Sequence, residues 1–240
     1  MPHLFPPWAL SPNELVWLGL LASLLAGLAT TIGALPILFT RSITRKTQDG
    51  LLGFAAGVML AATSFSLIIP AIEYGGGGFR GAGLAVIGIL AGGLFLDLVD
   101  SYSPHRHFIK GPEGGALSSG LARIWLFVIA ITIHNFPEGL AVGVGFGSGD
   151  LANGMTLAIG IGLQNLPEGL AVALALRREY DQLLKIFGVT LLTGIVEPIG
   201  GLFGVTAVLF AQPILPFFLA FAAGAMLFVI SDEIIPETHQ

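Results

Sequence analysis

The sequence nearly repeats itself within thirty residues: HNFPEGLAVGVGFG begins at His134, and QNLPEGLAVALAL begins at Gln164. Both copies lie inside long apolar runs. Each nevertheless carries amides, a helix-disrupting proline and a glutamate, and the first copy adds a histidine. Ionisable groups inside such runs are rare and usually mark a functional site. The repeat therefore indicates both the class of fold and the place of the chemistry.

The composition around the repeat is that of an integral membrane protein. Hydrophobic residues make up 54% of the 240 residues, charged residues only 10%, and the mean hydropathy is +0.87. A water-soluble domain carries about 25% charged residues, so this chain cannot cover a soluble surface. The chain has no cysteine, which excludes disulfides and thiolate metal sites. Its GxGxxG-like spellings follow no predicted strand and do not indicate a nucleotide site.

Seven apolar runs are long enough to cross the hydrocarbon core as helices, which needs about 20 residues each. They cover residues 15–40, 51–72, 81–100, 124–146, 154–176, 186–210 and 213–235. The runs are continuous rather than alternating, so the fold class we expect is all-α, a polytopic helical membrane protein. We expect residues 1–240 to form one transmembrane domain. The only extended polar segment, 101–120, is predicted to be a flexible cytoplasmic loop.

The basic residues predict the direction of the chain in the membrane. Nine of the ten fall in the loops after spans one, three and five, and only Arg80 falls on the other side. Lys and Arg are enriched in cytoplasmic loops. We therefore expect a multi-pass protein of the plasma (inner) membrane with its N-terminus outside.

Three glutamates lie near the midpoints of predicted spans: Glu138, Glu168 and Glu197. Placing an ionised group at a helix centre costs about 2.5–3.5 kcal/mol on insertion scales. No Lys or Arg lies within any predicted span to neutralise these carboxylates. Either they are protonated, or they surround a cation that comes from outside.

The spacing within each motif favours a cation. His134 and Glu138 are spaced i,i+4 and share one helical face, which Asn135 joins at i,i+3 to Glu138. Pro137 and Pro167 each remove one backbone donor and are expected to open the preceding helical turn, which frees a carbonyl oxygen. Spans four and five run antiparallel, so the two motifs meet in opposite directions, as in carriers with inverted repeats. We infer a divalent metal site between spans four, five and six.

The donor types indicate the class of metal. Imidazole with carboxylate suits zinc, iron, manganese and similar ions, and Met59 in span two could add a thioether. Three carboxylates could balance one ion or two. The acidic residues near the predicted cytoplasmic ends suggest either a release path or a solvated rim: Asp97, Asp100, Asp232 and Glu233.

These motifs resemble the ZIP (Zrt/Irt-like) family of metal transporters, and more narrowly its prokaryotic GufA-like branch. The resemblance runs from Gly33 to His239 and includes HNFPEGLAVG, QNLPEGLAVALALR, GIVEPIG and DEIIPETH. It implies eight helices in a three-two-three arrangement, of which seven are visible here. It also implies transport of Zn²⁺, and often Cd²⁺, Fe²⁺ or Mn²⁺, toward the cytoplasm by an elevator-like movement without ATP hydrolysis.

The resemblance further implies two adjacent metal sites. The first would use Met59, His134, Glu138, Gln164 and Glu168, and the second would use Asn135, Glu138, Asn165, Glu168 and Glu197. Glu138 and Glu168 would bridge them. Asn165 stands where some relatives have an aspartate, which lowers the negative charge of the second site.

Two other functions also use an intramembrane metal site. Intramembrane zinc hydrolases use His-Glu-x-x-His, but here no second histidine lies in any predicted span, so we do not expect an enzyme. A non-transporting metal sensor would bind metal without flux. The partners that we expect are divalent metal ions and the lipid bilayer, with no nucleic acid, and a homodimer is one assembly that the sequence allows.

Overall fold

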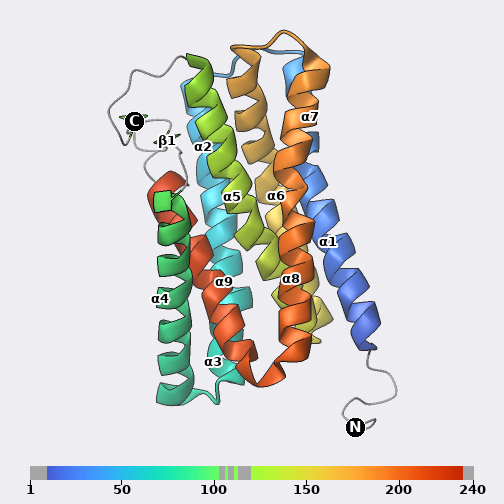
Figure 1. The fold of residues 1–240 in the computed structure, drawn as a ribbon, viewed down its shortest axis with the longest axis vertical. Helices are drawn as coiled ribbons and strands as arrows, with labels where there is room; N and C mark the ends of the chain where they lie inside the picture. Colours follow the sequence, from blue (N-terminus) through green and yellow to red (C-terminus); the bar gives the residue numbers. More distant parts are fainter. Residues whose placement is uncertain (1–9, 103–105, 108–110, 113–119, 235–240) are drawn as a thin grey trace.

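Seven long apolar helices make up the fold, as the sequence predicts. The computed structural model describes residues 10–102, 106–107, 111–112 and 120–234 (Figure 1). Within these residues the helices long and apolar enough to cross a membrane are Pro12–Leu38, Arg45–Tyr74, Gly78–Val99, Phe127–Gly147, Leu151–Arg177, Leu183–Phe210 and Gln212–Asp232. The all-α, polytopic class is thus confirmed. A three-two-three grouping needs an eighth helix and stays an expectation.

The first three spans form the N-terminal part. They consist of α1 (Pro12–Gly33) with a 3-10 turn η1 (Leu35–Leu38), then α2 (Arg45–Ala61), a π-helical segment η2 (Ala62–Ile68) and α3 (Ile69–Tyr74), then α4 (Gly78–Tyr102). Two-residue strands, β1 (Arg106–His107) and β2 (Gly111–Pro112), pair antiparallel after α4. Most of the loop 101–120, predicted to be flexible, lies outside the described residues.

The other four spans form the C-terminal part. They consist of α5 (Gly120–Gly147), α6 (Leu151–Arg177), α7 (Leu183–Gly194) followed by α8 (Val196–Phe210), and η3 (Gln212–Ile214) with α9 (Leu215–Val229) and the π-helical η4 (Ile230–Ile234).

Local sequence signals explain where several helices begin. Ser11 and Glu14 form a capping box at α1: the Ser11 hydroxyl accepts from the Glu14 backbone N–H at 3.3 Å, and the Glu14 carboxylate accepts from the Ser11 N–H at 2.7 Å. The Asp150 side chain caps α6 by accepting from the Asn153 N–H at 3.0 Å. These caps satisfy N–H groups that an apolar environment could not.

The three motif prolines have different effects on their helices. Pro137 and Pro167 lie inside the continuous helices α5 and α6, so the opened turns expected there do not interrupt the helix. Pro198 follows a real break: α7 ends at Gly194 and α8 begins at Val196. Pro198 lacks the N–H that would reach back to residue 194, which fits an end at that point.

The helices pack as two bundles. The first bundle consists of α1, α5, α6, α7 and α8, which contact one another, and the second consists of α2 with η2, α3, α4 and α9. The bundles meet mainly where α2 lies against α6 and where α5 lies against α9. Figure 1 shows α4 at one side of the molecule and α1 at the other.

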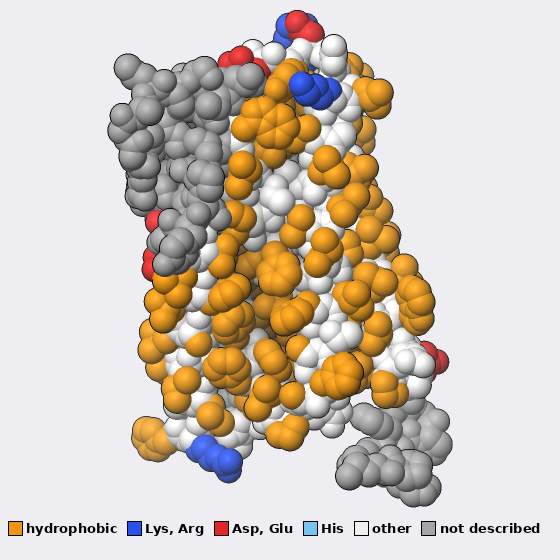
Figure 2. All heavy atoms as spheres, viewed as in Figure 1, with side chains coloured by type: hydrophobic (Ala, Val, Ile, Leu, Met, Phe, Trp, Pro, Cys, Tyr) orange, Lys and Arg blue, Asp and Glu red, His pale blue; other side chains and the backbone are white. Residues whose placement is uncertain are grey.

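The surface agrees with a membrane setting. In Figure 2 hydrophobic side chains cover the middle of the visible face, while the visible Lys and Arg side chains lie at its two ends. Large apolar residues on several helices are fully accessible or nearly so, among them Phe79, Leu184 and Phe210. Their exposure is what lipid contact requires.

Candidate metal site

Helix α5 places the first motif in the interior. His134, Asn135 and Glu138 share one face as the i,i+3 and i,i+4 spacing predicts, and none of them is more than 3% exposed. The side-chain amide of Asn135 donates to the backbone carbonyl of Thr193 in α7 at 2.9 Å. The first motif is therefore fixed against the broken sixth span.

Helix α6 places the second motif opposite the first. Gln164 and Asn165 are buried, and Glu168 is partly buried. The Gln164 side-chain amide donates to a carboxylate oxygen of Glu138. Gln164, the first residue of the second motif, thus contacts Glu138, the last polar residue of the first motif. Two copies of one motif on antiparallel helices are expected to meet in this way.

Glu197 joins this site from the start of α8. It is fully buried, and its carboxylate accepts a hydrogen bond from the Asn165 side-chain amide at 2.6 Å. The same amide group donates to the carbonyl of Ala26 in α1 at 2.8 Å. Asn165 therefore ties α1, α6 and α8 together around the third carboxylate.

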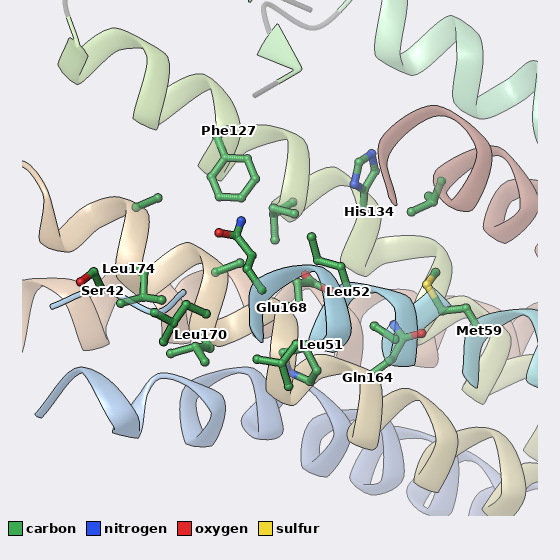
Figure 3. A pocket seen from close by; sticks show the side chains of 18 of the residues that line it. Ser42, Leu51, Leu52, Met59, Phe127, His134, Gln164, Glu168, Leu170 and Leu174 are labelled. Carbon is green, nitrogen blue, oxygen red and sulfur yellow. The ribbon is translucent and has the colours of Figure 1, made fainter. Parts of the chain in front are cut away.

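A cavity divides the predicted site residues into two layers. Its lining includes Met59, His134, Glu138, Gln164 and Glu168. Figure 3 shows His134 from α5, Glu168 and Gln164 from α6, and Met59 from α2 among the residues that line it. Asn135, Asn165 and Glu197 do not line this cavity. They form a buried layer behind it, and Gln164 joins the two layers, because its side-chain amide donates to Glu138 in the first and to Asn165 Oδ1 in the second, at 3.4 Å.

The two layers contain acceptor oxygens without donors. Among the described residues nothing donates a hydrogen bond to Asn135 Oδ1, Glu138 Oε2, Gln164 Oε1 or Glu197 Oε2, although all four atoms are buried. A buried polar atom without a partner costs about 1–3 kcal/mol, and a charged one costs more. Four such oxygens in one region are the chemistry that a cation would satisfy.

Carboxylate and imidazole groups alone do not complete the site. Within the described part of the chain, no three side chains of His, Asp or Glu lie close enough together to hold a metal ion. The set that the structure gathers is mixed, because the side-chain amides of Gln164 and Asn165 contact Glu138 and Glu197, and the thioether of Met59 lines the same cavity as Glu138.

The glycine of each Pro-Glu-Gly motif explains why the helices approach so closely. A side chain at Gly139 would overlap the carbonyl oxygen of Glu197, and a side chain at Gly169 would overlap that of Thr30. Each motif therefore sits against the backbone of a neighbouring helix, α8 in the first case and α1 in the second. The glycine in each repeated motif therefore has a packing role beside the polar residues that precede it.

Of the predicted release residues, the two whose side chains are described, Asp97 and Asp232, do not line the cavity. Asp97 is exposed on α4, and Asp232 in η4 is partly buried and has an interaction partner. The side chains of Asp100 and Glu233 lie outside the described residues. A release path through these four residues stays a prediction.

The structure adds features that the sequence did not indicate. The cavity runs from the site to the end of the bundle where Arg41, Ser42, Gln48 and Arg178 line it. In Figure 3 Ser42 and Leu174 lie toward one end of the cavity, and Met59 and Gln164 toward the other. The backbone carbonyls of Ala26 and Thr193, which orient the two asparagines, were also missed, because no side-chain pattern marks them.

Comparison with known proteins finds one matching family and several similar proteins. A sequence model of the family described as ZIP Zinc transporter matches residues 109–240. Zinc transporter GufA of Myxococcus xanthus is 50% identical over 226 residues, which cover 92% of this chain and 89% of that protein. Zinc transporter ZIPB of Bordetella bronchiseptica is 44% identical over 216 residues, covering 88% and 70%. Zinc transporter ZIP11 of Homo sapiens is 37% identical over 294 residues, covering 88% and 86%.

Proposed function

The chain belongs to the ZIP family of zinc transporters, in its GufA-like branch, and we propose that it carries Zn²⁺ across the membrane toward the cytoplasm. The observation that carries this proposal is the set of buried acceptor oxygens without donors at Asn135, Glu138, Gln164 and Glu197. In a transporter those atoms are satisfied each time an ion passes, which explains why they are kept in an apolar interior.

The position of the cavity supports the proposed direction of zinc transport, toward the cytoplasm. Its lining on the second span, Arg45–Tyr74, comes only from the part between Gln48 and Met59, and its lining on α6 only from the half that begins at Gln164. It therefore opens from the site toward the end that carries Arg41 and Arg178. Basic loops mark the cytoplasmic side, so the structure has the form expected for release inward. The N-terminus then lies outside, and a bacterial inner membrane is the setting that we propose.

The two bundles support an elevator-like mechanism. Seven of the eight proposed ligands lie on the first bundle, and only Met59 lies on the second. A sliding movement of the first bundle would carry the ion with its ligands past α2 and α9. Access would then alternate without ATP, because the gradient of the metal supplies the driving force.

The proposed sites follow the two layers. Met59, His134, Glu138, Gln164 and Glu168 would hold one ion at the cavity, and Asn135, Asn165 and Glu197 would help to hold a second ion behind it. Imidazole and thioether donors favour zinc and cadmium, while the oxygen donors also admit Fe²⁺ and Mn²⁺. We propose zinc as the main substrate and residues 1–240 as one transport domain.

Uptake of zinc into proteoliposomes tests the function. The wild type should fill the vesicles with zinc, and His134→Ala and Glu138→Ala should each reduce uptake to the level of empty liposomes. Glu179→Gln, which neutralises an exposed carboxylate between α6 and α7, is the matched control and should transport like the wild type. Wild-type flux in both site variants would reject the site, and zinc binding without flux would identify a sensor.

A further inference from the structure

A proline in the second span leaves one backbone carbonyl without its usual helical donor. In an α-helix the carbonyl of residue 66 accepts from the N–H of residue 70, and residue 70 is a proline, which has none. The backbone just before Pro70 forms the π-helical segment η2, in which the Ile69 N–H reaches Ser64 O five residues back. Such segments are often found at functional sites.

Asn153 of α6 donates to this carbonyl, where an α-helix would have used the N–H of residue 70. Its side-chain amide donates to the Ser66 carbonyl at 2.9 Å. The Asn153 backbone is held in the first turn of α6 by its hydrogen bond to the Asp150 cap, so the side chain extends from a fixed point. This hydrogen bond joins the first bundle to the second, because α6 belongs to one and η2 to the other.

The bond lies on the closed side of the seam between α2 and α6. On the other side of Met59 and Gln164 the seam holds the cavity. On the Asn153 side the helices touch: Gly160 faces Val58 and Ala62, and a Cβ at Gly160 would lie 3.6 Å from Val58 Cγ1 and 3.9 Å from Ala62 Cβ. That is ordinary van der Waals contact with no overlap, so the side-chain hydrogen bond adds a directional interaction there.

We propose that Asn153 is a latch that holds the outer side of the transporter closed while the inner cavity is open, an inference that rests on the transport function proposed above. When the first bundle slides, the Asn153 amide leaves the Ser66 carbonyl. A carbonyl with no donor is tolerated at membrane depth only where water reaches it. Opening of the outer side therefore hydrates Ser66, and the latch sets how often that state is visited.

The absence of cysteine makes the latch measurable, because any introduced thiol is unique. Ala62→Cys reports the outer side, since Ala62 is buried under Gly160, and Leu52→Cys reports the inner cavity. In the Ala62→Cys background, Asn153→Ala should raise the rate of labelling by a membrane-impermeant maleimide by about fivefold, the effect of one net hydrogen bond. In a separate protein with Leu52→Cys as its single thiol, Asn153→Ala should not raise the rate of labelling, whereas unfolding would raise it at both positions.

Thr156→Ala is the matched control on the same helix. The Thr156 hydroxyl donates to the carbonyl of Ala152 in its own helix at 2.8 Å and does not cross to α2. Its removal should leave labelling at residue 62 unchanged. Equal labelling rates in the Asn153→Ala and Thr156→Ala proteins would overturn the latch.

Pro70→Ala tests the latch by changing the acceptor side of the hydrogen bond instead of Asn153. Alanine restores an N–H that can pair with the Ser66 carbonyl inside the helix, so Asn153 loses its unique role. The effect of Asn153→Ala on labelling should therefore shrink in the Pro70→Ala background. A full fivefold effect in both backgrounds would show that the two residues are independent and would contradict the latch.

Failure of the latch and failure of the transport function can be told apart. Labelling is measured without zinc and does not depend on flux. Normal zinc flux with no change in labelling rejects the latch alone. A wild-type protein that carries no zinc rejects the transport function, whatever the labelling shows.

Discussion

The two bundles differ in what holds them together. Of the twelve buried polar side chains in the described residues, ten lie in the first bundle, and only Thr63 and Ser66 lie in the second. The second bundle is packed mainly by apolar groups, with α4 against α9 through contacts such as the Phe95 and Phe221 rings, whose centroids are 5.4 Å apart. The bundle that holds the polar site is thus also the one held by polar contacts.

The glycines differ between the interior of each bundle and the seam, which is the interface between the two bundles. Within the first bundle, side chains at Gly139 or Gly143 would overlap the backbone carbonyls of Glu197 or Gly201 in α8. Within the second, a side chain at Gly92 would overlap the carbonyl of Phe221. Among the described glycines only Gly160 faces across the seam, at an ordinary contact distance. Within each bundle glycines let backbones interlock, whereas the one glycine contact across the seam shows no such overlap, which is what the proposed sliding movement requires.

The largest effect that this comparison predicts is at Gly139. Gly139→Ala forces α5 and α8 apart, because the new methyl group meets backbone rather than a flexible side chain. Overpacking of this kind should destabilise the protein by about 3 kcal/mol. Thermal unfolding in detergent measures it. Gly57→Ala on α2, where no atom lies within 4 Å of the new methyl group, is the control and should change stability by less than about 1 kcal/mol.

Asn165 should show the next largest effect. Asn165→Ala removes hydrogen bonds to the Ala26 carbonyl and to Glu197, and both acceptors are buried in the first bundle. Leaving them without a donor should cost about 2–3 kcal/mol of stability. Thr206→Ala removes only the hydrogen bonds of its hydroxyl to the carbonyls of Leu202 and Phe203 in its own helix, so it should have a much smaller effect. Equal melting temperatures for both variants would remove Asn165 from its structural role.

Met59 should matter less, because it is one neutral thioether among eight proposed ligands and the only one of them on the second bundle. Met59→Leu keeps the volume and removes the sulfur, and zinc affinity should fall by about tenfold, the low end of effects for groups that tune a metal site. Calorimetric titration with zinc measures this. Met226→Leu on α9, a buried methionine that does not line the cavity, should leave zinc affinity unchanged.

The smallest effect is expected at the seam. Gly160→Ala adds a methyl group at ordinary contact distance from Val58 and Ala62, so the free energy of unfolding should change by less than about 0.5 kcal/mol. The same thermal unfolding assay that is used for Gly139→Ala measures it. A loss of stability as large as that of Gly139→Ala would show that the seam is as interlocked as the bundles are.

Much of the fold could be predicted from the sequence. The seven spans follow from apolar runs, and the burial of Glu138 and Glu197 follows from their places within two of those runs. The contact between Gln164 and Glu138 follows from two copies of one motif on antiparallel neighbours. These features depend on the local sequence pattern and on the membrane setting that the composition implies, so they can be predicted from the sequence alone.

Other features depend on tertiary packing and could not be read from the pattern. Pro137 and Pro167 were expected to open their helices, but α5 and α6 continue through them. The π-helical segment before Pro70 and its partner Asn153 lie 83 residues apart, counted from 70 to 153, and nothing local connects them. The division into two bundles and the side on which the cavity opens likewise arise only when the spans are packed.

The distance between helices, measured by electron spin resonance on labelled cysteine pairs, tests the central claim that one bundle slides past the other. Leu184→Cys on α7 is paired with Leu151→Cys on α6 for the first bundle, and with Leu90→Cys on α4 across the seam; all three positions are exposed. The account predicts one unchanged distance for the pair within the bundle, and two distances with zinc-dependent populations for the pair across it. A single distance across the seam, the same with and without zinc, would contradict the account.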